Sequence, residues 1–263
     1  MLALVDGDLI VYTVGYTTEL EDVEEAQWRT DAFIDSIILA TGATDYKVYL
    51  SDSSENNFRY KVNPEYKAHR TQPKPVHYDA IKEYLIVKHK AKIAHNREAD
   101  DELGIFQIRD LMCRKLIEEE PSTIIATIDK DMDMIPGLHY SWPIYRKGEI
   151  VREGKIYTVT EEEGLRFFYK QMIVGDTADN IRGIDGLGPK KTEKLFEGVP
   201  TEDLVEVVAD KYKEQWGDIW YEEMRKNSIL LWIKRSEEEN ELTPVERHYY
   251  QQQIKEISLG EAE

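Results

Sequence analysis

The sequence predicts an α/β fold with a central, mostly parallel twisted sheet flanked by helices, followed by a C-terminal helical region. Three apolar runs of strand length end beside an aspartate, near residues 5, 50 and 128, and helical patterns occupy much of the chain between them. The 263 residues suffice for one sizeable core and a smaller appended module. We expect a catalytic or binding domain at 1–175, a helical region at 176–235 and an acidic helical tail at 236–263.

The elements follow in chain order. Buried or edge strands are predicted at 1–5, 46–50, 92–94 and 123–128, and a β-hairpin at 142–157 around Lys147-Gly148. Helices are predicted at 9–16, 26–40, 76–89, from about 98 to 120, and at 160–174, 202–216 and 219–234. Gly42 and Pro121 are expected to end two of these helices, and Thr160-Glu161-Glu162-Glu163 is a capping box that begins another.

The charge is strongly uneven along the chain. The formal net charge of −18 argues against a nucleic-acid partner, because phosphate binding normally leaves a basic footprint. The segment 57–97 is the exception, because ten Lys/Arg face three Asp/Glu between Arg59 and Arg97. Tyr66, Lys67 and Arg70 are predicted to share one helical surface within it. The segment is either a solvated lysine-rich face or a site for an anionic partner.

Carboxylates recur where predicted strands end and helices begin. If the strands lie in one parallel sheet, many of these side chains meet at its carboxyl edge, where ligands bind in such sheets. Like charges so close together require cations, and oxygen ligands without a Cys/His cluster favour Mg²⁺ or Mn²⁺. Two such ions about 4 Å apart can hydrolyse phosphodiesters. Each carboxylate could instead cap a helix. The candidate ligands are Asp6, Asp52, Glu98, Asp100, Asp101, Asp129, Asp131, Asp176 and Asp179.

A glycine hairpin follows the last of these carboxylates. Gly186 and Gly188 flank Leu187 and permit a tight turn, while Pro189 suits the first position of a helix. The exposed N–H groups of a helix start bind anions, and Lys190 and Lys191 would strengthen a phosphate contact. The hairpin predicts contact with a DNA backbone, and an ordinary loop before a helix is the alternative.

Six motifs in this order resemble the flap endonuclease superfamily of 5′-nucleases, and most closely the bacteriophage 5′→3′ exonucleases. The motifs span about Leu2 to Phe196 and are Val-Asp6-Gly-Asp8, Ser-Asp52-Ser, Asn-Pro-Glu-Tyr66-Lys67-Ala-His-Arg70, Glu98-Ala-Asp100-Asp101, Asp129-Lys-Asp131, and Gly-Asp176-Thr-Ala-Asp179 with the glycine hairpin after it. The resemblance implies a PIN-like nuclease domain with a helix-hairpin-helix region at 176–235.

The resemblance also implies roles for these residues. Asp6, Asp52, Glu98, Asp100 and Asp101 would serve one Mg²⁺ (or Mn²⁺) and its water shell; Asp129, Asp131, Asp176 and Asp179 would form the second site. Tyr66, Lys67 and Arg70 match a catalytic arch near the scissile phosphate. Asp8 and Asp133 are not general to the superfamily pattern. DNA contacts are expected at Arg59, Lys61, Tyr66, Lys67, Arg70, Gly186, Gly188, Lys190, Lys191 and Thr192, with K⁺ among the carbonyls of the hairpin.

The expected partner is duplex DNA with a 5′ end or 5′ flap, with RNA–DNA hybrids as further substrates, and the expected protein is a monomer. The sequence shows no membrane-spanning run and no signal-peptide charge pattern, and Cys113 is its one cysteine. We therefore expect a cytoplasmic protein, of an infected bacterial host if phage-encoded. Two alternatives remain: a haloacid-dehalogenase-like phosphatase with Asp6 as nucleophile, and a DNA-binding module without catalysis.

Overall fold

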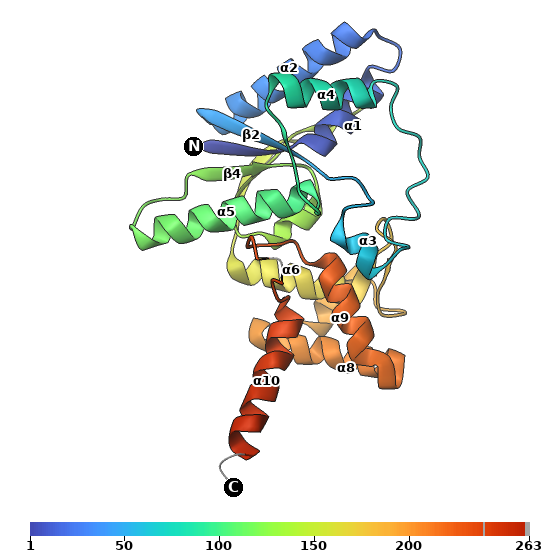
Figure 1. Ribbon diagram of the computed structural model, residues 1–263, viewed down its shortest axis with the longest axis vertical. Helices are drawn as coiled ribbons and strands as arrows, with labels where there is room; N and C mark the ends of the chain where they lie inside the picture. Colours follow the sequence, from blue (N-terminus) through green and yellow to red (C-terminus); the bar gives the residue numbers. More distant parts are fainter. Residues whose placement is uncertain (239, 261–263) are drawn as a thin grey trace. The chain divides into compact units, whose positions relative to one another are not determined.

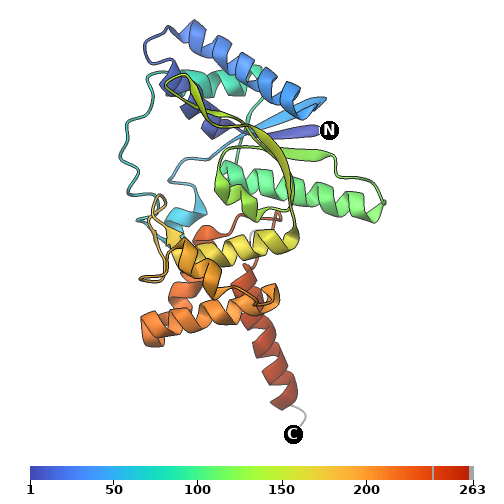
Figure 2. The ribbon, with the colours of Figure 1, turned by 180° about the vertical axis from the view of Figure 1, so that it is seen from behind.

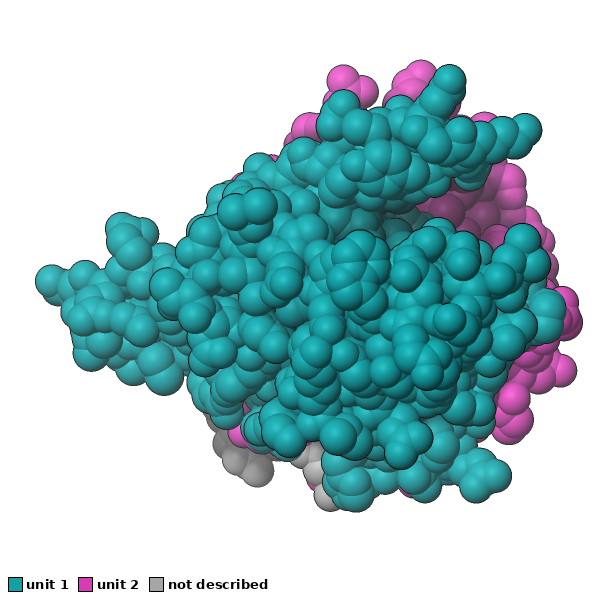
Figure 3. Space-filling model, turned by 90° about the horizontal axis from the view of Figure 1, so that it is seen from above, with its two compact units in different colours: residues 1–58, 72–161, 233–237 teal, residues 59–71, 162–232, 238–263 magenta. Residues whose placement is uncertain are grey.

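The computed structural model describes residues 1–238 and 240–260, so position 239 and the last three residues of the predicted acidic tail lie outside the described residues. The chain divides into two compact units (Figure 3). Unit 1 comprises Met1–Phe58, Gln72–Glu161 and Ile233–Glu237, and unit 2 comprises Arg59–Thr71, Glu162–Trp232 and Glu238–Glu263. The chain thus crosses between the units several times, whereas the predicted domains were contiguous.

A six-stranded sheet forms the centre of unit 1 (Figure 1), in the order β3-β2-β1-β4-β5-β8. The first five of these strands pair in parallel, and β8 alone pairs antiparallel, with β5. The predicted mostly parallel α/β sheet is therefore confirmed. The strands are β1 (Leu2–Asp6), β2 (Asp45–Leu50), β3 (Lys92–Ile93), β4 (Thr123–Ala126), β5 (Gly137–Ser141) and β8 (Lys155–Val159).

Helices cover both faces of this sheet (Figures 1 and 2). Helices α1 (Gly7–Thr17), α2 (Val23–Thr41) and α4 (Tyr78–Lys88) pack on one face, and α5 (Ala99–Leu116) packs on the other. Because β1 and β4 are buried on both faces, their sequences are continuous apolar runs, as parallel strands between two helical layers require. Gly42 ends α2 with φ of 65°, a left-handed conformation that glycine adopts without steric cost.

The predicted hairpin at 142–157 is only partly correct. Strands β6 (Ile144–Arg146) and β7 (Glu149–Arg152) form a separate two-stranded sheet around Lys147-Gly148. Tyr157 does not belong to this hairpin, because it lies in β8 and pairs with His139 of β5. Between β4 and β5 the chain forms the short 3₁₀-helix η1 (Lys130–Met134).

Unit 2 is mainly helical. Its larger elements are α6 (Glu161–Val174), which begins at the unit boundary, α8 (Leu204–Trp216), α9 (Trp220–Leu231) and α10 (Pro244–Gly260). Shorter ones are β9 (Gly175–Asp176), β10 (Ile181–Arg182), α7 (Pro189–Leu195), η2 (Thr201–Asp203) and η3 (Gly217–Ile219). Tyr212 is fully buried among them and donates its hydroxyl to the Met172 carbonyl at 2.9 Å. In the described part of the chain, no helix is both long and apolar enough to cross a membrane.

Candidate functional site

Asp6 ends β1 at the carboxyl edge of the sheet. Its Oδ1 accepts the N–H of Leu9 at 3.2 Å and thereby caps α1, while its Oδ2 accepts the hydroxyl of Thr127 at 2.9 Å. The residue is 3% exposed. Burial disfavours the charged form and, with repulsion from Asp8 and Asp129, raises the pKa of Asp6 to about 7. Asp6 is thus a carboxylate that is only partly ionised at neutral pH unless positive charge lies nearby.

Thr127 joins the end of β1 to the end of β4. Besides donating to Asp6, its Oγ1 accepts the N–H of Asp129 at 3.1 Å. Asp129 in turn caps η1, because its Oδ1 accepts the N–H of Asp131 at 2.9 Å. Thr127 belongs to none of the sequence motifs, and its only sequence signal is its position directly after a strand and two residues before Asp129.

Asp8 lies in the first turn of α1, close to the end of β2. Its Oδ2 accepts the N–H of Ser51 at 2.9 Å. Burial is the main cause that raises the pKa of Asp8, and repulsion from Glu98 adds to it, while Lys82 acts in the opposite direction. Asp8 therefore lies within electrostatic reach of both Asp6 and Glu98. The sequence analysis left its role open and missed Ser51.

The acidic cluster at 98–101 lies at the start of α5, where its side chains cap the helix and also bind a distant backbone segment. Glu98 is the N-cap residue and forms a capping box with Asp101, whose Oδ2 accepts the N–H of Glu98 at 3.1 Å. The other oxygen of Asp101 accepts the N–H of Lys234 at 3.0 Å, and Asp101 is fully buried. A Cβ at Gly104 would lie 2.6 Å from the Lys234 carbonyl oxygen. The Ile233–Glu237 segment of unit 1 therefore packs directly against the start of α5.

Asp52 holds two loops together. Its Oδ1 accepts the N–H of Ser53 at 2.7 Å and the amide of Asn56 at 3.1 Å, and its Oδ2 accepts the N–H of Asn96 at 2.9 Å. These bonds, that from Asn96 above all, lower the pKa of Asp52. Asp52 is thus ionised at neutral pH, and hydrogen bonds from the loop residues stabilise its negative charge. Its expected role as a metal ligand remains a prediction.

The donor chemistry of this edge suits a hard divalent cation, because the side chains that repel one another around Asp6 are all carboxylates. Within residues 1–238 and 240–260, however, no three Asp, Glu, His or Cys side chains are arranged as a ready metal site. The candidate ligands instead hydrogen-bond to backbone and hydroxyl groups, as described for Asp6, Asp52 and Asp129. The fit to a divalent ion therefore rests on oxygen chemistry and on like charges in mutual reach.

In unit 2 the three predicted arch residues converge on Asp179. The Tyr66 hydroxyl donates to Asp179 Oδ2 at 2.9 Å, Arg70 Nη2 donates to Oδ1 at 2.6 Å, and Lys67 Nζ lies 3.8 Å from Oδ2. The Lys67 N–H also donates to the Asp179 carbonyl at 3.0 Å. Nearby, Asp176 Oδ1 accepts the N–H of Ala178 at 2.8 Å. A predicted ligand and the predicted catalytic cations thus form one charged cluster.

The predicted helical surface shared by Tyr66, Lys67 and Arg70 is wrong. Helix α3 (Phe58–Val62) ends after five residues, and the chain then forms turns with Lys67 at φ of 57°. Pro64 explains the stop, because the residue before a proline is disfavoured in helical conformation. The three side chains gather through their common acceptor, Asp179, instead of through helical spacing.

The glycine hairpin forms as predicted at the start of α7. Gly186 has φ of 76°, and a Cβ at Gly186 or Gly188 would meet open space. Lys191 Nζ donates to the Gly186 carbonyl at 2.8 Å, while Lys190 is exposed. Thr192 is fully buried and its hydroxyl donates to the Gly188 carbonyl at 3.1 Å. Its side chain therefore shapes the turn, and the DNA contacts expected of the hairpin remain predictions.

Arg59 differs most from its expected role. It is 2% exposed, and it donates from Nε to the Leu230 carbonyl at 3.0 Å and from Nη2 to the Trp232 carbonyl at 2.8 Å. These carbonyls lie at the end of α9, where helices leave acceptors without intrahelical partners. These bonds give Arg59 a structural role within unit 2, and its expected DNA contact remains a prediction. Lys61, two residues later, is exposed.

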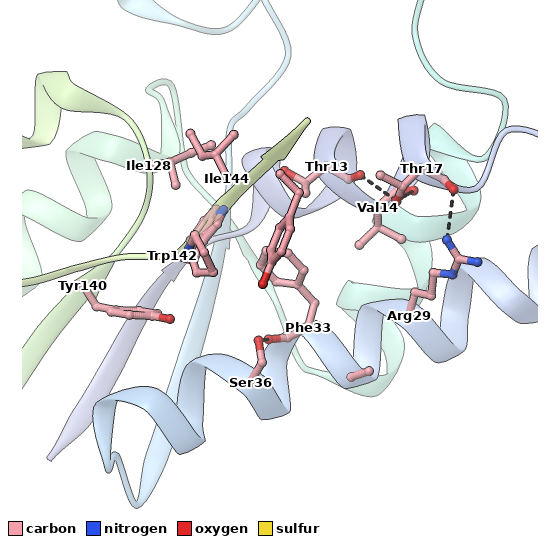
Figure 4. A pocket seen from close by; sticks show the side chains of 13 residues that line it. Thr13, Val14, Thr17, Arg29, Phe33, Ser36, Ile128, Tyr140, Trp142 and Ile144 are labelled. Atoms are coloured by element: carbon pink, nitrogen blue, oxygen red, sulfur yellow. Dashed lines mark hydrogen bonds between the residues drawn. The ribbon is translucent and has the colours of Figure 1, made fainter. Parts of the chain in front are cut away.

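Unit 1 also has an apolar pocket of about 530 Å³ that none of the predicted residues lines (Figure 4). It lies between α1, α2 and the chain around β5 and β6. Arg29 at its side is engaged by Glu25 at 2.7 Å and donates to the Thr17 carbonyl at 3.0 Å. The lining residues are Thr13, Val14, Thr17, Arg29, Ala32, Phe33, Ser36, Ile128, Tyr140, Trp142, Pro143, Ile144 and Tyr145. With few polar groups and no carboxylate, this pocket does not suit phosphodiester chemistry.

Sequence comparisons find distant relatives. No protein-family model matches the chain. It is 28% identical over 232 residues to a 5′-3′ exonuclease of Mycoplasma pneumoniae. This match covers 79% of this chain and 75% of that protein. It is 25% identical over 236 residues to DNA polymerase I of Bacillus caldotenax and 26% identical over 156 residues to flap endonuclease Xni of Shewanella baltica. The chain spans only 26% and 57% of the lengths of these two proteins.

Structural comparison finds the same group of proteins. The T5 D15 protein co-crystallised with metal ions superimposes with a TM-score of 0.54 at 16% identity, over 88% of this chain and 99% of that one. T5 5′-exonuclease with bound zinc superimposes with a TM-score of 0.50. At such identity the likeness shows a shared fold. Together with the sequence relatives, it makes the chain similar to the 5′-nucleases of the flap endonuclease superfamily, which supports the resemblance that the six motifs indicated.

Proposed function

We propose that the chain is a divalent-metal-dependent 5′-nuclease that hydrolyses phosphodiester bonds near the 5′ end of duplex DNA, as a 5′→3′ exonuclease or flap endonuclease. The observation that carries the proposal is the group of carboxylates in mutual reach at the carboxyl edge of the sheet. A buried Asp6 beside Asp8 and Asp129 is electrostatically costly, as its pKa of about 7 indicates. Divalent cations relieve that cost, and the relatives are nucleases by name.

The proposal assigns two ions, Mg²⁺ or Mn²⁺ as substitute, to the predicted ligand sets. When bound, they would supply a hydroxide-like water and neutralise the leaving oxygen. The residues of the chain hold the geometry: Thr127 orients Asp6 and the backbone of Asp129, and the capping box fixes Glu98 at the start of α5. The assignment of Asp176 and Asp179 to the second ion rests on the superfamily resemblance.

The DNA side of the proposal uses the basic residues of unit 2. Lys67 and Arg70 would leave Asp179 in part to contact the scissile phosphate, where positive charge stabilises the transition state. The hairpin of Gly186 and Gly188 with Lys190 would hold the duplex backbone, with K⁺ among its carbonyls. The proposed biological roles are primer removal and phage DNA replication, by a monomer that also accepts RNA in RNA–DNA hybrids.

The test is cleavage of 5′-labelled blunt, nicked, 5′-flapped and RNA–DNA hybrid substrates with Mg²⁺ and with EDTA. We expect metal-dependent release of short 5′ products, lost in Asp129→Asn and retained in Asp35→Asn, an exposed carboxylate on α2. Activity that persists in EDTA or in Asp129→Asn would contradict the proposal. A phosphoryl group trapped on Asp6 would establish the phosphatase alternative, and binding without cleavage the inert module.

A further inference from the structure

We propose that Asp8 is a positioning residue that, through Ser51, fixes the start of α5 and thus Glu98 relative to Asp6. The inference rests on the proposed function, because its purpose is to hold the carboxylates at the spacing that divalent ions require. It assigns to Asp8 and Ser51 a role that neither the motifs nor the relatives supply.

Hydrogen bonds connect the three elements in a row. Asp8, in the first turn of α1, accepts the N–H of Ser51 at 2.9 Å. Ser51 follows β2 directly, and its Oγ accepts the N–H of Ala99 at 3.0 Å. Ala99 is the first residue of α5 and follows Glu98, the N-cap residue. Ser51 therefore donates its N–H to α1 and accepts from α5 with its hydroxyl, so that one residue links the two helices.

Lys82 adds a contact to Ser51 from α4. Its Nζ lies 3.5 Å from the Ser51 carbonyl oxygen, and its charge attracts Asp8. Lys82 belongs to α4, so the backbone of Ser51 is held from α1 and α4 while its hydroxyl is held by α5. Groups that orient ligands from behind are typical of metal sites, and their loss commonly weakens metal binding about 10- to 100-fold. The Asp8 side chain, held by the Ser51 N–H, fits this orienting role.

Mn²⁺ binding, followed by electron paramagnetic resonance with the metal alone, separates a positioning residue from a ligand. We expect Asp8→Asn and Ser51→Ala each to raise the Mn²⁺ Kd about tenfold. The double variant should be no weaker than the worse single variant, because both changes break the same link. Ser51→Thr retains the hydroxyl and should bind Mn²⁺ as tightly as the wild type does. The matched controls Asp35→Asn and Ser36→Ala alter exposed residues of α2 and should bind as the wild type does.

Amide hydrogen exchange of Ala99 in metal-free protein provides a second, metal-independent readout. We expect faster exchange in Asp8→Asn and Ser51→Ala than in wild type. Wild-type Mn²⁺ affinity in Ser51→Ala, additive losses in the double variant, or unchanged Ala99 exchange would each overturn the inference. If Asp8→Asn does not fold, Ser51→Ala and Ser51→Thr decide alone. A wild-type chain that neither binds Mn²⁺ nor cleaves DNA would refute the proposed function, and the Ala99 exchange would still decide the link.

Discussion

Thr127 Oγ1 donates a hydrogen bond to Oδ2 of Asp6 at 2.9 Å, and Thr127 Oγ1 also accepts the N–H of Asp129 at 3.1 Å. One hydroxyl therefore sets both the orientation of the buried carboxylate after β1 and the backbone position after β4. Since Thr127 is 2% exposed, water cannot readily replace it. Its loss should affect both stability and metal binding.

We expect Thr127→Val to lower the free energy of unfolding by about 1–3 kcal/mol, because a buried acceptor and donor lose their partner. Metal affinity should fall roughly tenfold, as for other groups that orient a ligand. Chemical denaturation and Mn²⁺ titration measure the two effects. Thr30→Val is the control, because Thr30 is equally buried but donates to the Ala26 carbonyl within α2. Equal loss of Mn²⁺ affinity in both variants would contradict this role.

Asp6→Asn should stabilise the metal-free protein at neutral pH. The folded-state pKa of Asp6 is raised to about 7, above its ordinary value near 4, so the folded state binds the proton more tightly than the unfolded chain does. Stability due to this group is therefore full at low pH and is lost as pH rises from about 4 to about 7. In EDTA the variant should have the higher Tm at pH 7.5, with a smaller difference at pH 5.

Saturating Mg²⁺ should reverse this order at pH 7.5, because only the wild type gains the binding free energy of an ion held by Asp6. Thermal unfolding with and without Mg²⁺ measures both effects. A Tm difference that is the same at pH 5 and pH 7.5 in EDTA would show that Asp6 is not the group responsible.

Lys67→Ala should slow cleavage more than it weakens DNA binding. Its Nζ lies 3.8 Å from Asp179 Oδ2, beside Arg70, and the proposed role is to stabilise charge on the scissile phosphate. Loss of one such group commonly costs on the order of 100-fold in rate. Single-turnover cleavage at saturating protein and a separate binding titration in Ca²⁺ distinguish the two effects.

Two further lysine variants define the comparison. Lys190→Ala, in the glycine hairpin, should raise the Kd and reduce the salt dependence of binding by about one phosphate contact. Lys211→Ala, on α8 and hydrogen-bonded to Glu214, should change neither quantity. An unchanged single-turnover rate in Lys67→Ala would disprove the catalytic role.

Arg59→Met should destabilise the protein by about 2 kcal/mol, since the carbonyls of Leu230 and Trp232 lose a charged donor in a buried setting. Lys61→Met, at an exposed position of the same helix, should change stability by less than about 0.5 kcal/mol. Denaturant unfolding measures both. If Arg59→Met keeps wild-type stability and loses DNA affinity, then the expected DNA contact of Arg59 is correct after all.

The sequence predicted the central strands well because their environment is simple. Leu2–Asp6 and Thr123–Ala126 are buried on both faces, so a continuous apolar run suffices to find them. The antiparallel pair β5 and β8 was not recognised. The sequence of Lys155–Val159 suits either an arm of a hairpin or an edge strand of a sheet. Its pairing partner therefore cannot be read from the local sequence.

The carboxylates after the strands were predictable for the same reason, but the groups that orient them were not. The Ser51–Asp8 and Thr127–Asp6 bonds connect residues 43 and 121 positions apart. Serine and threonine in these positions also have ordinary turn functions, so only the fold reveals which partner they meet. Helical spacing does not predict the turns after Val62, because Pro64 disfavours a helical conformation at Asn63.

The return of Ile233–Glu237 to unit 1 limits how the protein can be dissected. The N–H of Lys234 satisfies a buried oxygen of Asp101, and the Lys234 carbonyl packs against Gly104. A recombinant fragment that stops at residue 161 would retain the whole six-stranded sheet yet lose the hydrogen bond from Lys234 to Oδ1 of Asp101. If the acidic edge is transplanted into another scaffold, the segment Ile233–Glu237 must therefore be included, either fused to the fragment or added as a separate peptide.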